Sequence, residues 1–129
     1  MAARMPILTF LMGLGSESAM DDHPQLVQTV LDTTEPRILV EFYRLLLGLS
    51  YRPGDEPPVE GASDDADGLV LRDADGTNKL AFRHGDHLTR TTWPRHDVLM
   101  QMHLDLAVPG TTDLHTQRER AQSRGAVPA

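Results

Sequence analysis

Few side chains in this sequence combine the type and the spacing that catalysis or metal binding needs. His84 and His87 stand three residues apart. They follow a predicted strand and lead into a linker, so no helix places both rings on one face. Asp73, Asp75 and Gly76 match the first positions of a calcium-binding loop, but the remaining ligands of such a loop are missing. Neither group by itself predicts a metal site.

Two other polar side chains stand within segments that alternate like β-strands. Gln28 lies in residues 26–32 and His103 lies in residues 101–108. We expect both side chains to border a cavity, where Gln28 forms hydrogen bonds or contacts a ligand. For His103, three roles stay open: a cavity histidine, a metal ligand, or an acid/base or substrate contact. Trp93, beside Pro94, is a further candidate substrate contact, with filling of an internal seam as the alternative.

Charge and composition exclude several classes of protein. The formal net charge is −7, and eight acidic residues with one basic residue lie between Gly54 and Gly76. An acidic chain does not suit nucleic acid, which needs a basic face. The sequence has no Cys, which excludes disulfide scaffolds and iron–sulfur clusters. No apolar run reaches the roughly 18 residues of a membrane span.

The N-terminal residues predict no folded element. We interpret residues 1–25 as a disordered N-terminal extension, with a secretory signal as the alternative, because an apolar stretch follows a single early Arg. Nothing later in the sequence needs an oxidising compartment, so we expect a cytoplasmic protein. The acidic loop, residues 53–67, contains three prolines and is expected to be exposed and solvated.

The elements that must position these side chains can be predicted from the spacing of apolar residues. Helical periodicity and a closing Gly48 predict a helix over residues 36–47. Asp75-Gly76 between two apolar runs predicts a hairpin. The remaining predicted elements are strands at residues 26–32, 49–52 and 101–108, the hairpin strands at 68–72 and 79–83, and a helix over roughly 112–124 that begins at Thr111-Thr112-Asp113. The order β-α-β-β-β, linker, β-α indicates an internal repeat with a shorter second copy.

Three stretches in this order resemble the vicinal oxygen chelate superfamily, which includes glyoxalase I, bleomycin-resistance proteins and extradiol dioxygenases. The first resembles the opening strand and Phe-Tyr helix of the superfamily and has the sequence LVQTVLDTTEPRILVEFYRLLLGL. The second, GLVLRDADGTNKLAF, resembles its hairpin, and the third, MHLDLAVPGTTDLHTQRERAQSRGA, resembles the start of its second module. In detail the chain is similar to glyoxalase-like proteins of actinobacteria.

The resemblance implies an α+β fold in which βαβββ modules enclose a cavity that often holds a divalent metal. We expect a glyoxalase-like domain over residues 26–125, made of a first module (26–84), a linker (85–100) and a C-terminally truncated second module (βα, 101–125). The family's ligand positions fall on Gln28 and His103. Its carboxylate position falls near Ala81, where no acid stands. Two of four ligands make a poor metal site.

The resemblance therefore favours a protein that binds an unknown small molecule in the cavity between modules, without catalysis. A metal-dependent lyase, isomerase or dioxygenase is the alternative, and an inactive remnant is a third interpretation. The exposed apolar edge expected at residues 101–108 predicts a homodimer or larger assembly, with this segment at or near the interface.

Overall fold

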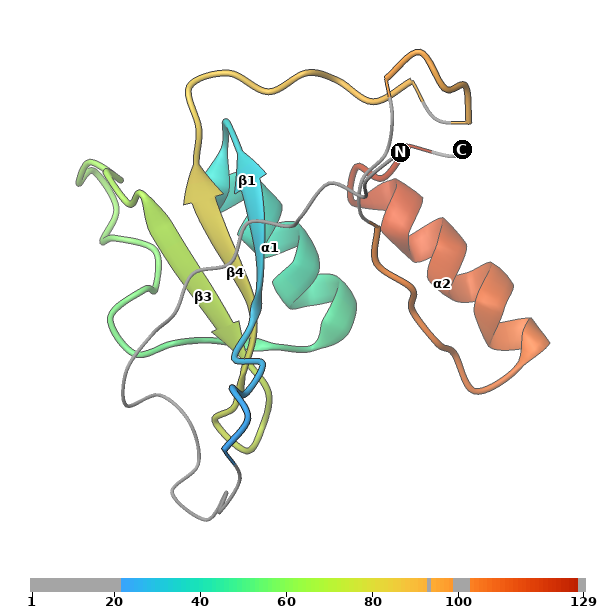
Figure 1. Cartoon of the computed structure of the whole chain (residues 1–129), viewed down its shortest axis with the longest axis horizontal. Coiled ribbons are helices and arrows are strands. Elements are labelled where there is room, and N and C mark those ends of the chain that lie inside the picture. The colour runs from blue at the N-terminus through green and yellow to red at the C-terminus, as the bar shows by residue number, and fades with distance from the viewer. Residues whose placement is uncertain (1–21, 93, 99–102, 128–129) are drawn as a thin grey trace.

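The computed structural model describes residues 22–92, 94–98 and 103–127, which form a mixed α+β fold with one four-stranded sheet and two helices (Figure 1). The elements are β1 (Thr29–Thr33), α1 (Pro36–Leu47), β2 (Ser50–Tyr51), β3 (Gly68–Arg72), β4 (Asn78–His84) and α2 (Thr111–Ser123). The first five reproduce the predicted β-α-β-β-β order. Within the described part of the chain, no helix is both long and apolar enough to cross a membrane.

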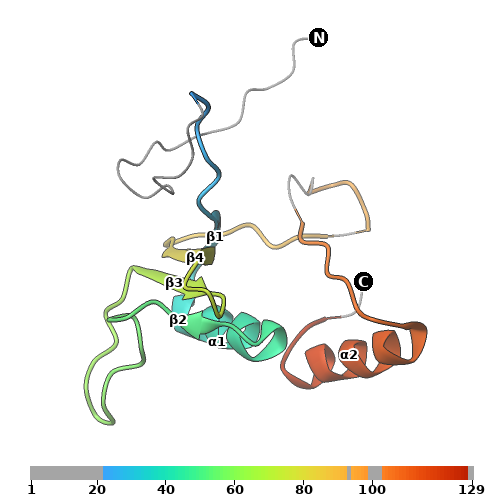
Figure 2. The same ribbon diagram turned by 90° about the horizontal axis from the view of Figure 1, so that it is seen from below.

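The sheet has the strand order β1-β4-β3-β2, with β1 parallel to β4 and the other pairs antiparallel. A parallel pair needs a crossover connection, and α1 is part of that connection. Helix α1 lies behind the sheet in Figure 1 and below it in Figure 2, so it covers one face. Helix α2 lies beside α1 and does not cover the other face (Figure 2).

The hydrophobic core lies between the sheet and α1. Val40 of α1 is fully buried, and Leu69, Leu71, Leu80 and Phe82 of β3 and β4 pack with it. The Phe82 ring stacks on Tyr43 of α1, with 5.8 Å between the ring centroids. These side chains occupy alternate positions of their strands, as expected for a sheet with one face on a core.

The bounds of α1 follow from local chemistry. Pro36 begins the helix, where its missing N–H costs nothing. Thr33 Oγ1 accepts a hydrogen bond from the Glu35 N–H at 3.0 Å and fixes the preceding turn. Gly48 ends the helix in the left-handed conformation, with a φ of 67°, which a glycine adopts without strain. The predicted bounds of this helix are confirmed.

The predicted hairpin is also confirmed. β3 and β4 pair in an antiparallel register that includes Val70 with Ala81. Asp73 Oδ1 accepts hydrogen bonds from the N–H groups of Asp75 and Thr77, both at 3.0 Å, and Gly76 has a φ of 79°. These contacts show that Asp73, Asp75 and Gly76 serve the turn.

The strand predicted at residues 101–108 is wrong over residues 103–108, which have no regular secondary structure. Residues 101 and 102 lie outside the described residues. The alternating pattern is physically insufficient here because a strand also needs a neighbour for its backbone, and none of the described strands pairs with this segment. The helix after it is confirmed as α2, although its capping position is Gly110, before the predicted Thr residues.

Candidate functional site

The face of the sheet opposite α1, here called the open face, is the candidate functional site. Leu31 of β1 packs on the core, and Thr33 is buried on the same side of the strand as Leu31. Because side chains alternate along an extended chain, Val30 and Asp32 of β1, and Gln28 just before it, lie on the open face. Val30 is 48% exposed, and the Asp32 side chain is also 48% exposed. The expectation that this side of the first strand borders a cavity or water is therefore consistent with its exposure.

One end of the open face carries a chain of hydrogen bonds between three half-buried side chains. Arg72 Nε donates to Asn78 Oδ1 at 2.8 Å. Asn78 Nδ2 donates in turn to Gln28 Oε1 at 3.1 Å. The chain joins the end of β3, the start of β4 and the residue before β1. Gln28 thus lies within a polar cluster, with its side-chain oxygen already accepting a hydrogen bond.

The other end of the open face carries an ion pair between neighbouring strands. Arg83 donates through Nε and Nη2 to the two carboxylate oxygens of Asp32, both at 3.0 Å. This bidentate pair joins β4 to β1, whose register places the two residues opposite each other. Asp32 holds the Arg83 guanidinium and raises its pKa. Both partners are engaged with each other.

A row of apolar side chains separates the two polar ends. Val30, Ala81 and Val70 are aligned across β1, β4 and β3 by the sheet register. Ala81 and Val70 are buried, whereas Val30 stays half exposed at the strand edge. The face therefore combines one exposed apolar side chain, Val30, with fixed polar groups at its two ends.

The other predicted site residues do not join this cluster. The His103 side chain is 67% exposed in the irregular segment, and its Nε2 lies 3.3 Å from Asp105 Oδ1. The strand expected around His103 is absent, and its three candidate roles remain predictions. His84 ends β4 and its Nδ1 lies 3.8 Å from Asp86 Oδ1. Trp93 lies outside the described residues.

The acidic loop is attached to the helix more firmly than the sequence predicts. Arg37 of α1 donates to both carboxylate oxygens of Asp64, at 2.7 and 3.2 Å, and to the backbone oxygen of Asp55 at 2.7 Å. Its guanidinium also lies over the Tyr51 ring, 5.3 Å from the centroid. Asp55 Oδ2 accepts the N–H of Val70 at 2.9 Å. Asp64, Asp65 and Asp67 are exposed as expected, and Asp64 in addition forms an ion pair with Arg37 that the sequence did not predict.

The Arg37–Asp64 pair gives a testable prediction. The hydrogen bond from Arg37 lowers the pKa of Asp64 below its ordinary 3.8. The stabilisation is therefore complete above pH 3.8 and is lost as the pH falls through the lower, folded-state value. At neutral pH, Asp64→Asn should let a Glu-specific protease cleave the loop after Glu60 several-fold faster; Glu56 precedes a proline, which blocks cleavage. Asp65→Asn, with the same change of charge at an exposed position, should leave the cleavage rate unchanged. Equal rates in both variants would contradict the assignment.

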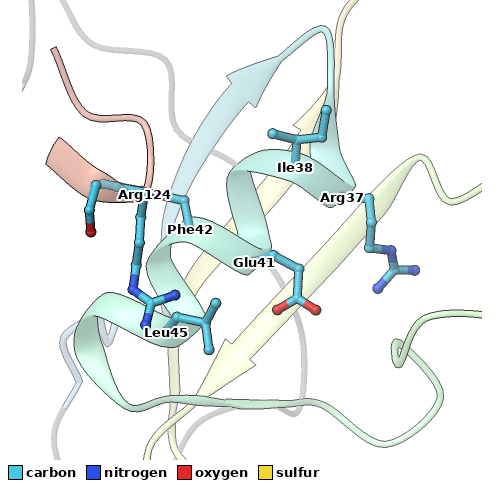
Figure 3. A pocket seen from close by; sticks show the side chains of 7 residues that line it. Arg37, Ile38, Glu41, Phe42, Leu45 and Arg124 are labelled. Atoms are coloured by element: carbon cyan, nitrogen blue, oxygen red, sulfur yellow. The ribbon is translucent and has the colours of Figure 1, made fainter. Parts of the chain in front are cut away.

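Two pockets lie away from the open face. A polar one of about 390 Å³ borders the acidic loop and includes Asp65, Asp67 and His84. The other, of about 460 Å³, lies between α1 and α2, with Ile38, Phe42 and Leu45 along α1 and Arg124 reaching back from the end of α2 (Figure 3). Ile38 is 68% exposed there. Neither pocket contains Gln28 or His103.

Comparisons with known proteins establish the family. Residues 28–129 match the family model described as a glyoxalase-like domain. The chain belongs to the glyoxalase-like domain family. The match agrees with the resemblance to the vicinal oxygen chelate superfamily. A comparison with curated proteins finds no match.

A solved structure supports the fold of this glyoxalase-like domain. It is described as a possible glyoxalase from Bacillus cereus, and it matches with a TM-score of 0.52 and 15% sequence identity over 78% of this chain and 74% of its own. At this identity the likeness concerns the fold alone.

The residues of this glyoxalase-like domain do not fit the divalent metal that the superfamily often holds. Gln28 would offer its side-chain oxygen, but that oxygen accepts a hydrogen bond from Asn78, which also joins it to the cation Arg72. Ala81 occupies the expected carboxylate position. Among the described residues, no group of three or more His, Asp or Glu side chains is arranged to hold a metal ion. We therefore derive no chemical step through a metal.

Sequence reasoning located Gln28 but missed Arg72 and Asn78 as its neighbours. The two missed residues stand on either side of the hairpin turn, where a register shift next to Arg72 places it opposite Asn78. Bulges of this kind are common where a strand reorients a side chain. The available signal was the polar type of both residues beside the predicted Asp-Gly turn.

Proposed function

We propose that this glyoxalase-like domain binds a small molecule on the open face of its sheet. The observation that carries the proposal is the row Val30–Ala81–Val70 between two polar ends, on the face opposite α1, where Val30 is exposed at the edge of the sheet and Ala81 and Val70 are buried beside it. Sites for small molecules combine an apolar lining with a few fixed polar groups. We propose binding without catalysis, because the polar groups of this face hold one another in place.

A ligand screen by thermal shift tests this proposal. A ligand at ten times its Kd should stabilise the domain by about 1.4 kcal/mol. Val30→Asp should abolish that stabilisation, because a carboxylate interrupts the apolar row at its exposed end. Ile38→Asp provides the matched control, since Ile38 is an exposed aliphatic residue in the pocket between α1 and α2. Loss of stabilisation in the Ile38 variant alone would place the site in that pocket.

Metal analysis separates this proposal from the second hypothesis, a metal-dependent lyase, isomerase or dioxygenase. A stoichiometric divalent ion whose affinity falls in His103→Ala or Gln28→Ala would favour the enzyme. A failure of every compound in the screen to stabilise the domain would favour an inactive remnant.

For location we propose the cytoplasm, which fractionation of cells can test.

We also propose that the protein acts as a homodimer. Among the described strands, β1 pairs only with β4, so its other edge is open to a strand of another chain. Val30 lies at that edge and is 48% exposed, and Leu106, in the irregular segment 103–108, is 52% exposed. Size-exclusion chromatography with light scattering should give twice the chain mass of 14.3 kDa. A monomer that melts cooperatively at micromolar concentration would contradict the proposal.

A further inference from the structure

We propose that the ligand of the open face is a small organic oxyanion, a carboxylate or phosphate, bound at the end formed by Arg72, Asn78 and Gln28. The proposal rests on the proposed function and adds the chemical class of the ligand. It follows from the direction of the hydrogen bonds between the three side chains.

The guanidinium fixes that direction. Arginine can only donate, so the Asn78 side chain must present its oxygen to Arg72. Its amide nitrogen then faces Gln28 and must donate, which leaves Gln28 to accept through Oε1. Within the described part of the chain, the groups that remain for a ligand are the Arg72 terminal nitrogens and Gln28 Nε2. All of them are donors, so this end of the face is complementary to an acceptor.

Charge points to the same class of ligand. The other described Arg and Lys residues in or directly next to the strands of the sheet each have a carboxylate partner: Arg52 with Asp55 at 3.0 Å, Lys79 with Asp73 at 3.6 Å, and Arg83 with Asp32 at 3.0 Å. Within this described set, Arg72 alone has a neutral amide as its partner. A half-buried guanidinium without a counter-charge favours an anion, and its planar donors suit two oxygens.

The apolar row accounts for the rest of the ligand. Val30, the exposed member of the row, lies two residues after Gln28 on the same side of the chain, which corresponds to roughly 7 Å along an extended strand. An aromatic ring or a short aliphatic chain attached to the oxyanion would therefore lie against Val30, whose neighbours Ala81 and Val70 are buried. The ligand thus combines an acidic head with a compact apolar body.

Titration of the full-length protein with three related probes, followed through backbone amide shifts of the open face, tests the inference. The probes are benzoate, phenyl phosphate and the neutral benzamide. We expect one or both anions to bind at least about tenfold more tightly than benzamide, as a charge-assisted hydrogen bond implies. Preference between benzoate and phenyl phosphate identifies which oxyanion the site takes.

Gln28→Glu is the decisive variant. Asn78 can still donate to the new carboxylate, but the outward amide donor becomes a negatively charged acceptor. Anion affinity should fall at least about tenfold, with benzamide unaffected. Gln122→Glu on exposed α2 makes the same chemical change elsewhere and should alter affinity less than about twofold. If Gln28→Glu does not fold, Asn78→Asp serves instead, because it neutralises Arg72 and should also abolish anion binding.

Three results would overturn the inference. Benzamide binding as tightly as the anions would leave small-molecule binding intact but remove the oxyanion preference. Unchanged anion affinity in Gln28→Glu would place the head group elsewhere. Absence of binding by all three probes would also overturn it, while the thermal-shift comparison of Val30→Asp with Ile38→Asp decides the proposed function separately.

Discussion

Replacing Phe82 by alanine is expected to lower the free energy of unfolding by about 3–5 kcal/mol, enough to unfold much of the domain. Phe82 is 1% exposed in the middle of β4, stacks on Tyr43, and packs with the core residues of β3 and α1. Truncation removes the largest buried side chain where the parallel and antiparallel strand pairs meet, and β4 carries both pairings. No neighbouring element can fill the cavity without breaking this register.

Urea denaturation followed by circular dichroism measures this effect. Val59→Ala, a truncation of an exposed side chain in the acidic loop, is the control and should change stability by less than about 0.5 kcal/mol. A Phe82→Ala variant within 1 kcal/mol of the parent protein, a limit set by the smallest costs of core truncation, would mean that the core does not depend on β4 as described.

Replacing Arg120 by methionine is expected to release α2 while the four-stranded unit stays folded. Helix α2 has no buried residue among those described, and its apolar residues form no continuous stripe. Its attachment to α1 includes the Arg120 guanidinium, which donates to the backbone oxygens of Leu45 at 2.5 Å and Leu46 at 3.4 Å. These bonds also satisfy carbonyls at the end of α1, which lack partners within the helix.

Hydrogen exchange read residue by residue checks this prediction. A charge-assisted hydrogen bond contributes about 1.5–3 kcal/mol, so its loss should speed amide hydrogen exchange in α2 by at least about tenfold. The exchange rates of the amides in β3 and β4 should stay unchanged. Arg118→Met, an exposed substitution on the same helix with the same loss of charge, should have little effect. Equal exchange in both variants would show that Arg120 does not hold the helix.

Local patterns determined most of the elements of this protein. Pro36, the apolar spacing and Gly48 define α1 through rules that act within a few residues, and the Asp75-Gly76 turn defines the hairpin in the same way. The order of these elements was also sufficient for the resemblance to the glyoxalase-like family, which the match over residues 28–129 bears out. Gln28 could be placed on the open face because alternation along a strand is a local property.

Only the tertiary structure decided how the site is built. Residues 103–108 alternate like a strand, yet they are irregular, because a strand exists only where another strand pairs with it. The partner of Gln28 is Asn78, fifty residues away in sequence, and a register shift beside Arg72 brings the third member of the cluster to it.

The acidic loop shows the same division between local pattern and long-range contact. Its composition predicted solvent exposure, which holds for Asp64, Asp65 and Asp67. Its attachment to α1 depends on Arg37, which reaches Asp64 across 27 residues. Hydrogen bonds between residues so far apart depend on which elements the fold brings together, and the spacing of residues along the chain does not predict that arrangement.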